Sequence, residues 1–214
     1  MPTSRSDATG PDDDAGSLVD VAVVGGGPAG MSAAVAAADC GASVLLIDAG
    51  PVLGGQFWRH PPDRALAKEV ASQHHGLRHY RHLARSITRH ARSGRLDVLS
   101  RHEVWTLERN GDNGFAVRMI HRAAATEQER VVRARALVIA PGAYDRQLPF
   151  PGWTLPGVMT AGGVQAMLKG SGTVAGQRVL VAGTGPFLLP VAAGLASAGA
   201  TVVGVHEASG ATGW

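Results

Sequence analysis

The sequence contains very little cysteine. Cys40 is the single cysteine among 214 residues, so the chain can form neither an internal disulfide nor a Cys-x-x-Cys redox pair. Cys40 follows an alanine-rich stretch, and we expect its side chain to pack in a helix. No thiol is therefore expected to take part in chemistry within this chain.

The N-terminal segment lacks a secretory signal. Residues 1–18 have no basic start and no apolar core, and contain instead Asp12, Asp13 and Asp14 among Gly, Ser and Pro, which predicts a disordered tail. Residues 179–205 contain no charge and are long enough to span a bilayer, but glycines and prolines interrupt them repeatedly. Because the same letters fit a strand, a turn, a helix and a strand, we expect a soluble, cytoplasmic protein without a membrane span.

Charge is nearly balanced along most of the chain. The formal net charge is +3, and 45% of the residues are apolar, so the chain can bury the core of one large domain or two modest ones. Basic residues gather between positions 78 and 95 and do not cover the sequence. Nucleic acid is therefore not the expected partner.

Two glycine-rich turns stand out among the features that are present. The first follows an apolar strand-like run, and its Gly25, Gly27 and Gly30 match G-x-G-x-x-G. In this pattern the first glycine forms a sharp turn, the second lets the backbone approach a pyrophosphate, and the third lets a helix pack closely on the sheet. The N-terminus of that helix, with Pro28 and Ala29 in its first turn, faces the phosphates. The first turn thus predicts a dinucleotide site.

An acidic residue stands at the position that this motif requires. Asp48 follows the next apolar strand, where a carboxylate can accept hydrogen bonds from an adenosine ribose. A strand over 18–24, a helix over 28–39 and a strand over 43–47 together predict a β-α-β unit with a parallel sheet.

The middle of the chain has a different pattern. Apolar residues recur with helical spacing over residues 77–91, which predicts an amphipathic helix with a basic surface. The arginines of that surface are Arg78, Arg81, Arg85, Arg89 and Arg92. Short strands at 96–99, 104–107, 115–121 and 131–134 predict an antiparallel meander inserted into the nucleotide domain. Residues 136–140 are predicted to form a further strand, and residues 161–169 a short helix.

The second glycine turn is less complete. Gly183, Gly185 and Pro186 follow an apolar strand, but Leu188 occupies the position of the third glycine, so we expect looser helix packing. Glu207 follows the next strand, and an acid there favours the free ribose hydroxyl of NAD over the 2′-phosphate of NADP. The alternative is a degenerate unit that binds no nucleotide.

Other candidate sites are weaker. His75, His79 and His82 can share a helical face, but neighbouring arginines repel a cation and no cysteine joins them, so we expect no metal site. Trp58 and Tyr144 lie in loops rich in Gly and Pro, where aromatic residues more often anchor packing than contact a cofactor. We assign no catalytic acid, base or nucleophile.

The motifs resemble those of a known family. The first glycine turn, Asp48 and the following Gly54-Gly55-Gln56 resemble the FAD-dependent pyridine-nucleotide oxidoreductases. The runs APGAYDR at 140–146, LPFPGW at 148–153 and GPFLLP at 185–190 narrow the resemblance. They are similar to the FAD-containing subunits of opine oxidases, hydroxyproline or proline dehydrogenases and cyanide-forming glycine dehydrogenases. The resemblance covers residues 19–207.

This resemblance implies a set of cofactor contacts. The residues implied to contact FAD are Gly25, Gly27, Pro28, Ala29, Gly30, Asp48, Gly55, Gln56, Val104 and Gly142. The residues implied for a second site, where NAD is expected, are Gly183, Gly185, Pro186 and Glu207. Val104 would meet the adenine through its backbone, and Gly142 would bring the chain back against FAD. Pro141 stands where the family has threonine, so a hydroxyl and an N–H donor are missing.

The resemblance also implies a domain plan. Residues 1–18 would be a tail, residues 19–155 the N-terminal part of an FAD-binding domain, and residues 156–214 the start of an NAD-type domain. In the family the chain continues beyond this point and returns to complete the FAD domain, so we expect a truncated or fragmentary chain. The expected fold class is α/β, a Rossmann-like fold with a parallel sheet, an inserted antiparallel meander and an incomplete second nucleotide-binding domain.

Three functions are compatible with the sequence. The leading hypothesis is an FAD-dependent oxidoreductase subunit that handles electrons from the oxidation of an amino acid, opine or secondary amine. In such complexes the oxidation is implied to occur on a partner flavoprotein subunit. The second hypothesis is an NADH-dependent flavin reductase. The third is a non-catalytic nucleotide-binding subunit or an inactive truncated product.

Overall fold

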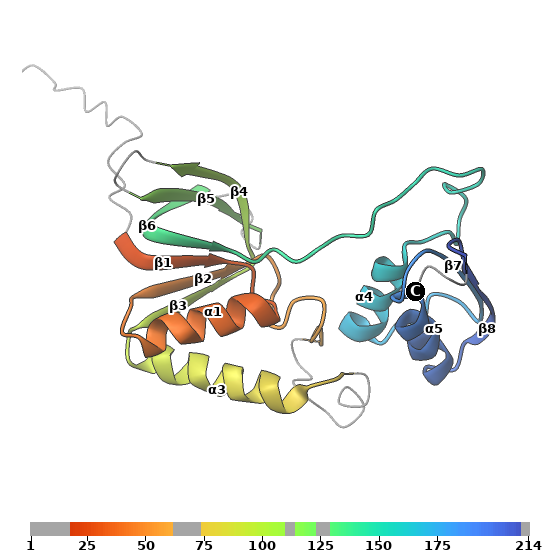
Figure 1. Ribbon diagram of the computed structural model, residues 1–214, viewed down its shortest axis with the longest axis horizontal. Coiled ribbons are helices and arrows are strands. Elements are labelled where there is room, and N and C mark those ends of the chain that lie inside the picture. The colour runs from red at the N-terminus through yellow and green to blue at the C-terminus, as the bar shows by residue number, and fades with distance from the viewer. Residues whose placement is uncertain (1–17, 62–73, 110–113, 123–128, 211–214) are drawn as a thin grey trace, which may run out of the picture. The chain divides into compact units, whose positions relative to one another are not determined.

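A computed structural model describes residues 18–61, 74–109, 114–122 and 129–210 (Figure 1). By spatial contact the chain forms two compact units. Unit 1 comprises Met1–Pro51 and His82–Pro141, and unit 2 comprises Val52–Arg81 and Gly142–Trp214. The predicted tail lies outside the described residues, apart from Leu18.

Unit 1 begins with the predicted β-α-β unit. Strand β1 (Leu18–Val24) leads into helix α1 (Pro28–Asp39), and strand β2 (Val44–Asp48) pairs with β1 in parallel. Strand β3 (Leu96–Ser100) pairs in parallel with the other side of β2. The prediction that residues 96–99 belong to the meander is therefore wrong, because β3 extends the parallel part of the sheet.

The meander consists of β4 (His102–Arg109), β5 (Phe115–His121) and β6 (Glu129–Ile139). These strands complete a six-stranded sheet in the order β3-β2-β1-β6-β5-β4. The sequence predicts separate strands at 131–134 and 136–140, but one strand, β6, covers both ranges. It pairs with β5 in antiparallel fashion and with β1 in parallel, so it joins the meander directly to the nucleotide-binding part.

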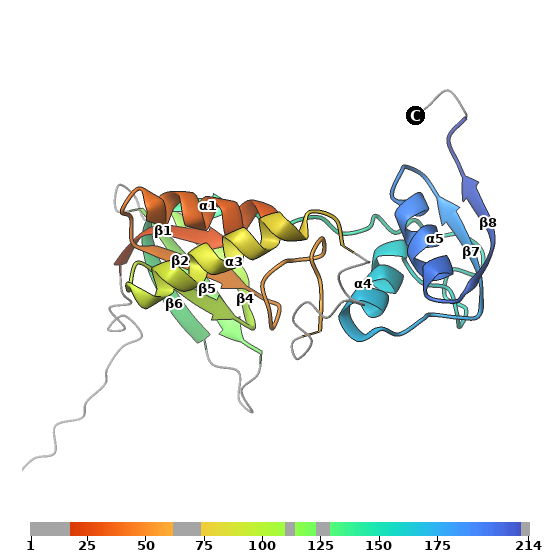
Figure 2. The same ribbon diagram turned by 90° about the horizontal axis from the view of Figure 1, so that it is seen from below.

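Helices α1 and α3 (Leu77–Arg92) lie side by side on one face of the sheet (Figures 1 and 2). The amphipathic prediction for α3 is confirmed, since Leu83, Ile87 and His90 are buried whereas the arginines between them are exposed. His90 Nε2 lies 2.7 Å from Asp39 Oδ1 at the end of α1, which connects the two helices.

The main core of unit 1 connects the parallel strands with the meander. Its buried residues are Ala22, Leu45, Ile47, Val117, Met119, Val132 and Ala134. Burying a side chain the size of valine or leucine contributes roughly 1.5–3 kcal/mol, so this cluster fixes the register of both parts. Side chains alternate along a strand, so Val23 and Leu46 face the opposite side, which the helices cover.

Unit 2 contains the second strand, turn, helix and strand. After helix α4 (Ala161–Ser171), strand β7 (Arg178–Gly183), helix α5 (Leu188–Ser197) and strand β8 (Thr201–Glu207) follow, and β7 and β8 pair in parallel. Their core comprises Val164, Val181, Leu188, Val191, Ala192, Leu195 and Ala200. No helix within the described ranges is long and apolar enough to cross a membrane.

Candidate dinucleotide-binding site

The first glycine turn can be built only from residues without a side chain. Gly25 has a φ of 105°, and a Cβ there would lie 2.0 Å from the carbonyl oxygen of Ala140. A Cβ on Gly30 would lie 1.7 Å from the carbonyl oxygen of Gly25 and 3.4 Å from Cγ1 of Val23. Helix α1 therefore sits directly on the turn, and β6 closes the turn from the other side.

The turn leaves several backbone donors without an acceptor. The N–H groups of Gly27, Ala29 and Gly30 form no hydrogen bond with any residue that the structure describes. Gly27 caps the helix in an extended conformation with φ −76° and ψ −174°, and Pro28 occupies the first helical position. Free N–H groups and the positive end of the helix dipole together make an anion-binding site.

Asp48 holds this turn in place. As the last residue of β2, it accepts a hydrogen bond from Gly26 N–H at Oδ2, with a distance of 2.5 Å, and from Gly50 N–H at Oδ1, with a distance of 2.7 Å. Each carboxylate oxygen has a second lone pair, so Asp48 can still accept from a ribose hydroxyl. The acid is therefore both a support of the turn and a possible acceptor at its edge.

The loop that carries Gly55 and Gln56 belongs to unit 2. Gly54 and Gly55 have φ angles of 126° and 58°, and Trp58 N–H donates to the carbonyl of Gly54 at 3.0 Å. The Gln56 side-chain Nε2 donates to the carbonyl of Ala143 at 3.2 Å. This contact brings the loop next to the segment that begins at Gly142, another glycine with positive φ.

A buried aromatic cluster supports the same loop. Trp58 is 3% exposed, and its indole N–H donates to the carbonyl of His75 at 2.9 Å. Its ring packs against Tyr80, which in turn packs against buried His60. Burial raises the pKa of the Tyr80 hydroxyl. The interpretation of Trp58 as a packing anchor is confirmed, whereas Tyr144 is 92% exposed and anchors no packing.

Val104 lies near the end of β2 that carries Asp48. Arg101 N–H donates to the carbonyl of Gly50 at 3.0 Å, so β4 starts beside that strand end. The side chain of Val104 is half-buried and packs against the main core of unit 1. A contact between its backbone and an adenine stays a prediction.

The second turn repeats the use of an acid to support it. Glu207 is the last residue of β8, and it accepts from Gly185 N–H at 2.9 Å and from Ser209 N–H at 2.9 Å. These hydrogen bonds, with that of Ser209 the strongest influence, lower the pKa of Glu207. Asp48 and Glu207 thus play the same structural part at the ends of corresponding strands.

The two turns differ in the donors that they leave free. Helix α5 begins only at Leu188, whose N–H lies 3.3 Å from the carbonyl of Gly185, and Leu189 N–H lies 3.2 Å from that of Pro186. The first helical donors are therefore partly satisfied by the turn itself. Leu188 is buried and packs over Gly183, whose added Cβ would lie 3.3 Å from Cδ2 of that leucine.

Two polar residues form contacts that the sequence does not predict. Asp145 Oδ2 accepts from Gly162 N–H at 2.5 Å and so covers the start of α4. Lys169 Nζ donates to the carbonyl of Phe57 at 3.4 Å, and burial lowers the pKa of this lysine. Neither contact has a local sequence signal, because the partners are far apart in the chain.

The structure separates the candidate residues into two sets. Gly25 to Gly30, Asp48 and Val104 belong to unit 1, whereas Gly55, Gln56, Gly142 and the second turn belong to unit 2. Cys40 is exposed, so the prediction that it packs in a helix is wrong. It follows α1 as a C-cap, where its side chain has no packing neighbour to exclude water. Among the residues with described positions, no three of His, Cys, Asp and Glu gather as metal ligands.

A parallel β-α-β unit with a G-x-G-x-x-G turn and a strand-terminal acid defines a Rossmann-like dinucleotide-binding protein. The sequence matches the family model of the pyridine nucleotide-disulphide oxidoreductases over residues 19–212. The chain therefore belongs to this family, and the recognition from the motifs is confirmed.

Its relatives include subunits of two bacterial enzymes. A subunit of opine oxidase from Agrobacterium tumefaciens (strain Ach5) is 36% identical over 190 residues, covering 87% of this chain and 36% of the relative. Hydrogen cyanide synthase subunit HcnB of Pseudomonas protegens is 38% identical over 190 residues, covering 87% of this chain and 38% of the relative. The chain thus spans little more than a third of the length of these relatives.

The fold is also similar to that of a solved structure. L-Proline dehydrogenase from P. horikoshii superposes with a TM-score of 0.67 and 22% sequence identity, over 89% of this chain and 35% of that one. This similarity confirms the expected mixed α/β, Rossmann-like fold class.

Proposed function

We propose that this chain is an FAD-binding oxidoreductase subunit that handles electrons from the oxidation of an amino acid, opine or secondary amine. The observation that carries the proposal is the set of free N–H groups at the start of α1, beside the carboxylate of Asp48. Family membership supports the redox class, and relatives named as subunits of opine oxidase and of hydrogen cyanide synthase support the substrate class.

The first turn fits the diphosphate of FAD. Gly27, Ala29 and Gly30 would donate to the phosphate oxygens, while Pro28 presets the helix start without using a donor. Asp48 would accept from the adenosine ribose through its remaining lone pairs. Gly55, Gln56, Val104 and Gly142 would line the rest of the cofactor.

Bound FAD would supply the hydride and electron-transfer chemistry, and the chain would position it and control its surroundings. We assign the oxidation step itself to a partner flavoprotein subunit, and the electron-handling role to this chain. The relatives' designation as subunits supports an assembly of this kind.

The second turn is a candidate site for NAD. Glu207 ends β8 as the ribose acceptor should, and the described residues that follow it include no arginine that would neutralise a 2′-phosphate. Because Gly185, Leu188 and Leu189 already use their N–H groups, we expect weaker binding here than at the first turn. With NADH at this site, the chain would act as a flavin reductase.

The domain plan belongs to the same proposal. Residues 19–155 would form part of the FAD-binding domain, including the meander, and residues 156–214 part of the second nucleotide-binding domain. Contact defines the two compact units, whereas the cofactor that each segment binds defines these domains.

Substitution of Gly27 tests the proposal with little effect on folding. Its φ and ψ are accessible to valine, so Gly27→Val places a side chain in the path of the pyrophosphate without backbone strain. Gly176→Val is the control, because an added Cβ there has no neighbour closer than 3.8 Å. FAD titration, followed by flavin fluorescence, should show binding to the wild type and the control but not to Gly27→Val. Equal binding by all three proteins would contradict the proposal.

A further inference from the structure

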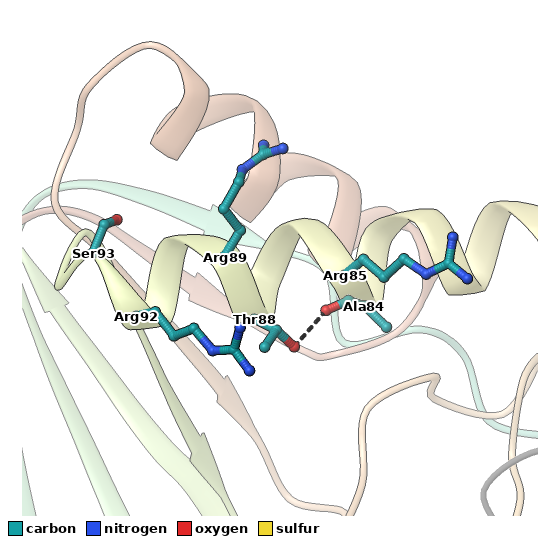
Figure 3. A pocket seen from close by; sticks show the side chains of 6 residues that line it. All are labelled: Ala84, Arg85, Thr88, Arg89, Arg92 and Ser93. Carbon is teal, nitrogen blue, oxygen red and sulfur yellow. Dashed lines mark hydrogen bonds between the residues drawn. The ribbon is translucent and has the colours of Figure 1, made fainter.

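The outer face of α3 carries an unbalanced positive charge. The helix contains repeated arginines and no Asp or Glu. We call the part within unit 1 the arginine face, and its arginines are Arg85, Arg89 and Arg92. Together with Ala84, Thr88 and Ser93 they line an open hollow of about 710 Å³ (Figure 3).

Only part of this charge is compensated within the chain. Arg89 points toward α1 in Figure 3, and its Nη2 lies 3.1 Å from Asp39 Oδ1. Both side chains are more than half exposed, at 65% and 53%, so water screens their attraction. Arg85 and Arg92 form no ion pair with any residue whose position is described. Their guanidinium groups are therefore available to an external anion.

We propose that the arginine face docks an acidic segment of a partner protein, whose carboxylates pair with Arg85 and Arg92. A guanidinium group presents a planar fork of donors that matches a carboxylate in a two-point contact. Residues seven positions apart in a helix are separated by about 10.5 Å along its axis. A partner helix with acids two turns apart would present carboxylates at the same spacing.

The chemistry of the face favours protein over nucleic acid or membrane. Its lining residues include no aromatic side chain on which bases could stack and no large apolar side chain that could enter a bilayer. Duplex-binding proteins commonly make about 6–10 phosphate contacts, more than this short stripe provides. Acidic protein surfaces need only a few well-placed carboxylates. That relatives are named as subunits is consistent with a protein partner.

The test uses the full chain and a labelled polyglutamate of about 20 residues, a length that forms several turns of acidic chain. Binding is measured by fluorescence anisotropy at low salt, because screening weakens exposed charge pairs. The double variant R85Q/R92Q should bind at least about tenfold more weakly, since charged hydrogen bonds are lost at both positions. The control R130Q/R133Q removes the same charge from exposed positions on β6 and should stay within about twofold of the wild type, since it leaves the arginine face intact.

Two further comparisons make the test specific. R85K/R92K keeps the charge but loses the fork, so it should recover only part of the wild-type affinity. Equal losses in R85Q/R92Q and R130Q/R133Q would show a response to net charge and overturn the proposal. So would tighter binding of duplex DNA or phosphatidylserine vesicles through the same arginines. FAD content, measured in parallel, should be unchanged in R85Q/R92Q, which separates this result from the cofactor proposal.

Discussion

Asp48 and Gly26 form the contact that links the strand-terminal acid to the glycine turn. The Gly26 N–H donates to Asp48 Oδ2 at 2.5 Å, although the residues are 22 positions apart in sequence. The same arrangement recurs between Glu207 and Gly185, again across 22 positions, at 2.9 Å. An acid at this position therefore supports the turn before any ribose is present, which gives it a structural role beside the proposed binding role.

Asp48→Asn should weaken FAD binding by about tenfold or more, because hydrogen bonds to charged groups contribute roughly 1.5–3 kcal/mol and one acceptor oxygen becomes a donor. Isothermal titration with FAD measures the change. Asp97→Asn, at an exposed position on β3, removes the same charge and should leave the affinity unaltered. Similar affinities for both variants would show that Asp48 supports neither the turn nor the ribose.

Gly25 and Gly41 allow steric contact to be separated from backbone strain. Both have positive φ, of 105° and 91°, but only Gly25 has a close neighbour for an added Cβ. Gly41→Ala should cost about 1–2 kcal/mol of unfolding free energy from the left-handed conformation alone. Gly25→Ala should cost at least about 1–3 kcal/mol more, because its Cβ overlaps the backbone of Ala140. Denaturant unfolding of both variants measures the difference, and equal costs would contradict the close contact between the turn and β6.

Acid should loosen the second turn. The pKa of Glu207 is lowered in the folded chain, chiefly by the Ser209 N–H, so its contribution to stability is present above the unfolded pKa. That contribution is lost as the pH falls through the lower folded value, below about pH 4.3. Glu207→Gln should therefore reduce the loss of stability in this range. Thermal unfolding at a series of pH values measures it, with Glu103→Gln, in an exposed ion pair with Arg122, as the control. An unchanged acid dependence in Glu207→Gln would count against these hydrogen bonds.

Cys40→Ala should leave flavin content and the rate of flavin reduction unchanged. The thiol is exposed at the end of α1, and surface substitutions usually alter stability by no more than about 0.5 kcal/mol. Stopped-flow absorbance of the flavin measures the rate. A large loss of rate with normal flavin content would show that the thiol takes part in turnover.

The local parts of the fold could be predicted from the sequence. Helix α1 has the predicted bounds, and β2 is displaced by one residue, because the glycine motif and the apolar runs that specify them are local signals. The errors concern partners distant in the chain. Strand β6 looks like two short strands in sequence, since exposed Arg133 and Arg135 alternate with buried residues, and its pairing with both β1 and β5 has no local signal.

The candidate site was predictable to a similar extent. Spacing identified Gly25, Gly30 and Asp48, and the close approaches at these glycines follow from the motif. Spacing did not indicate that Gln56 would contact the carbonyl of Ala143, or that Trp58 would anchor the loop beside it. These contacts depend on how segments distant in sequence pack together, which local periodicity does not encode.

The identity of the bound cofactor tests the central claim most directly. The purified chain, saturated with FAD, FMN and NAD together and then freed of unbound ligand, can be denatured and its released ligand separated by chromatography. The account predicts FAD, near one molecule per chain, in the wild type and in Gly176→Val, and its loss in Gly27→Val. Release of FMN alone, or of NAD in place of FAD, would contradict the assignment of the first glycine turn to FAD.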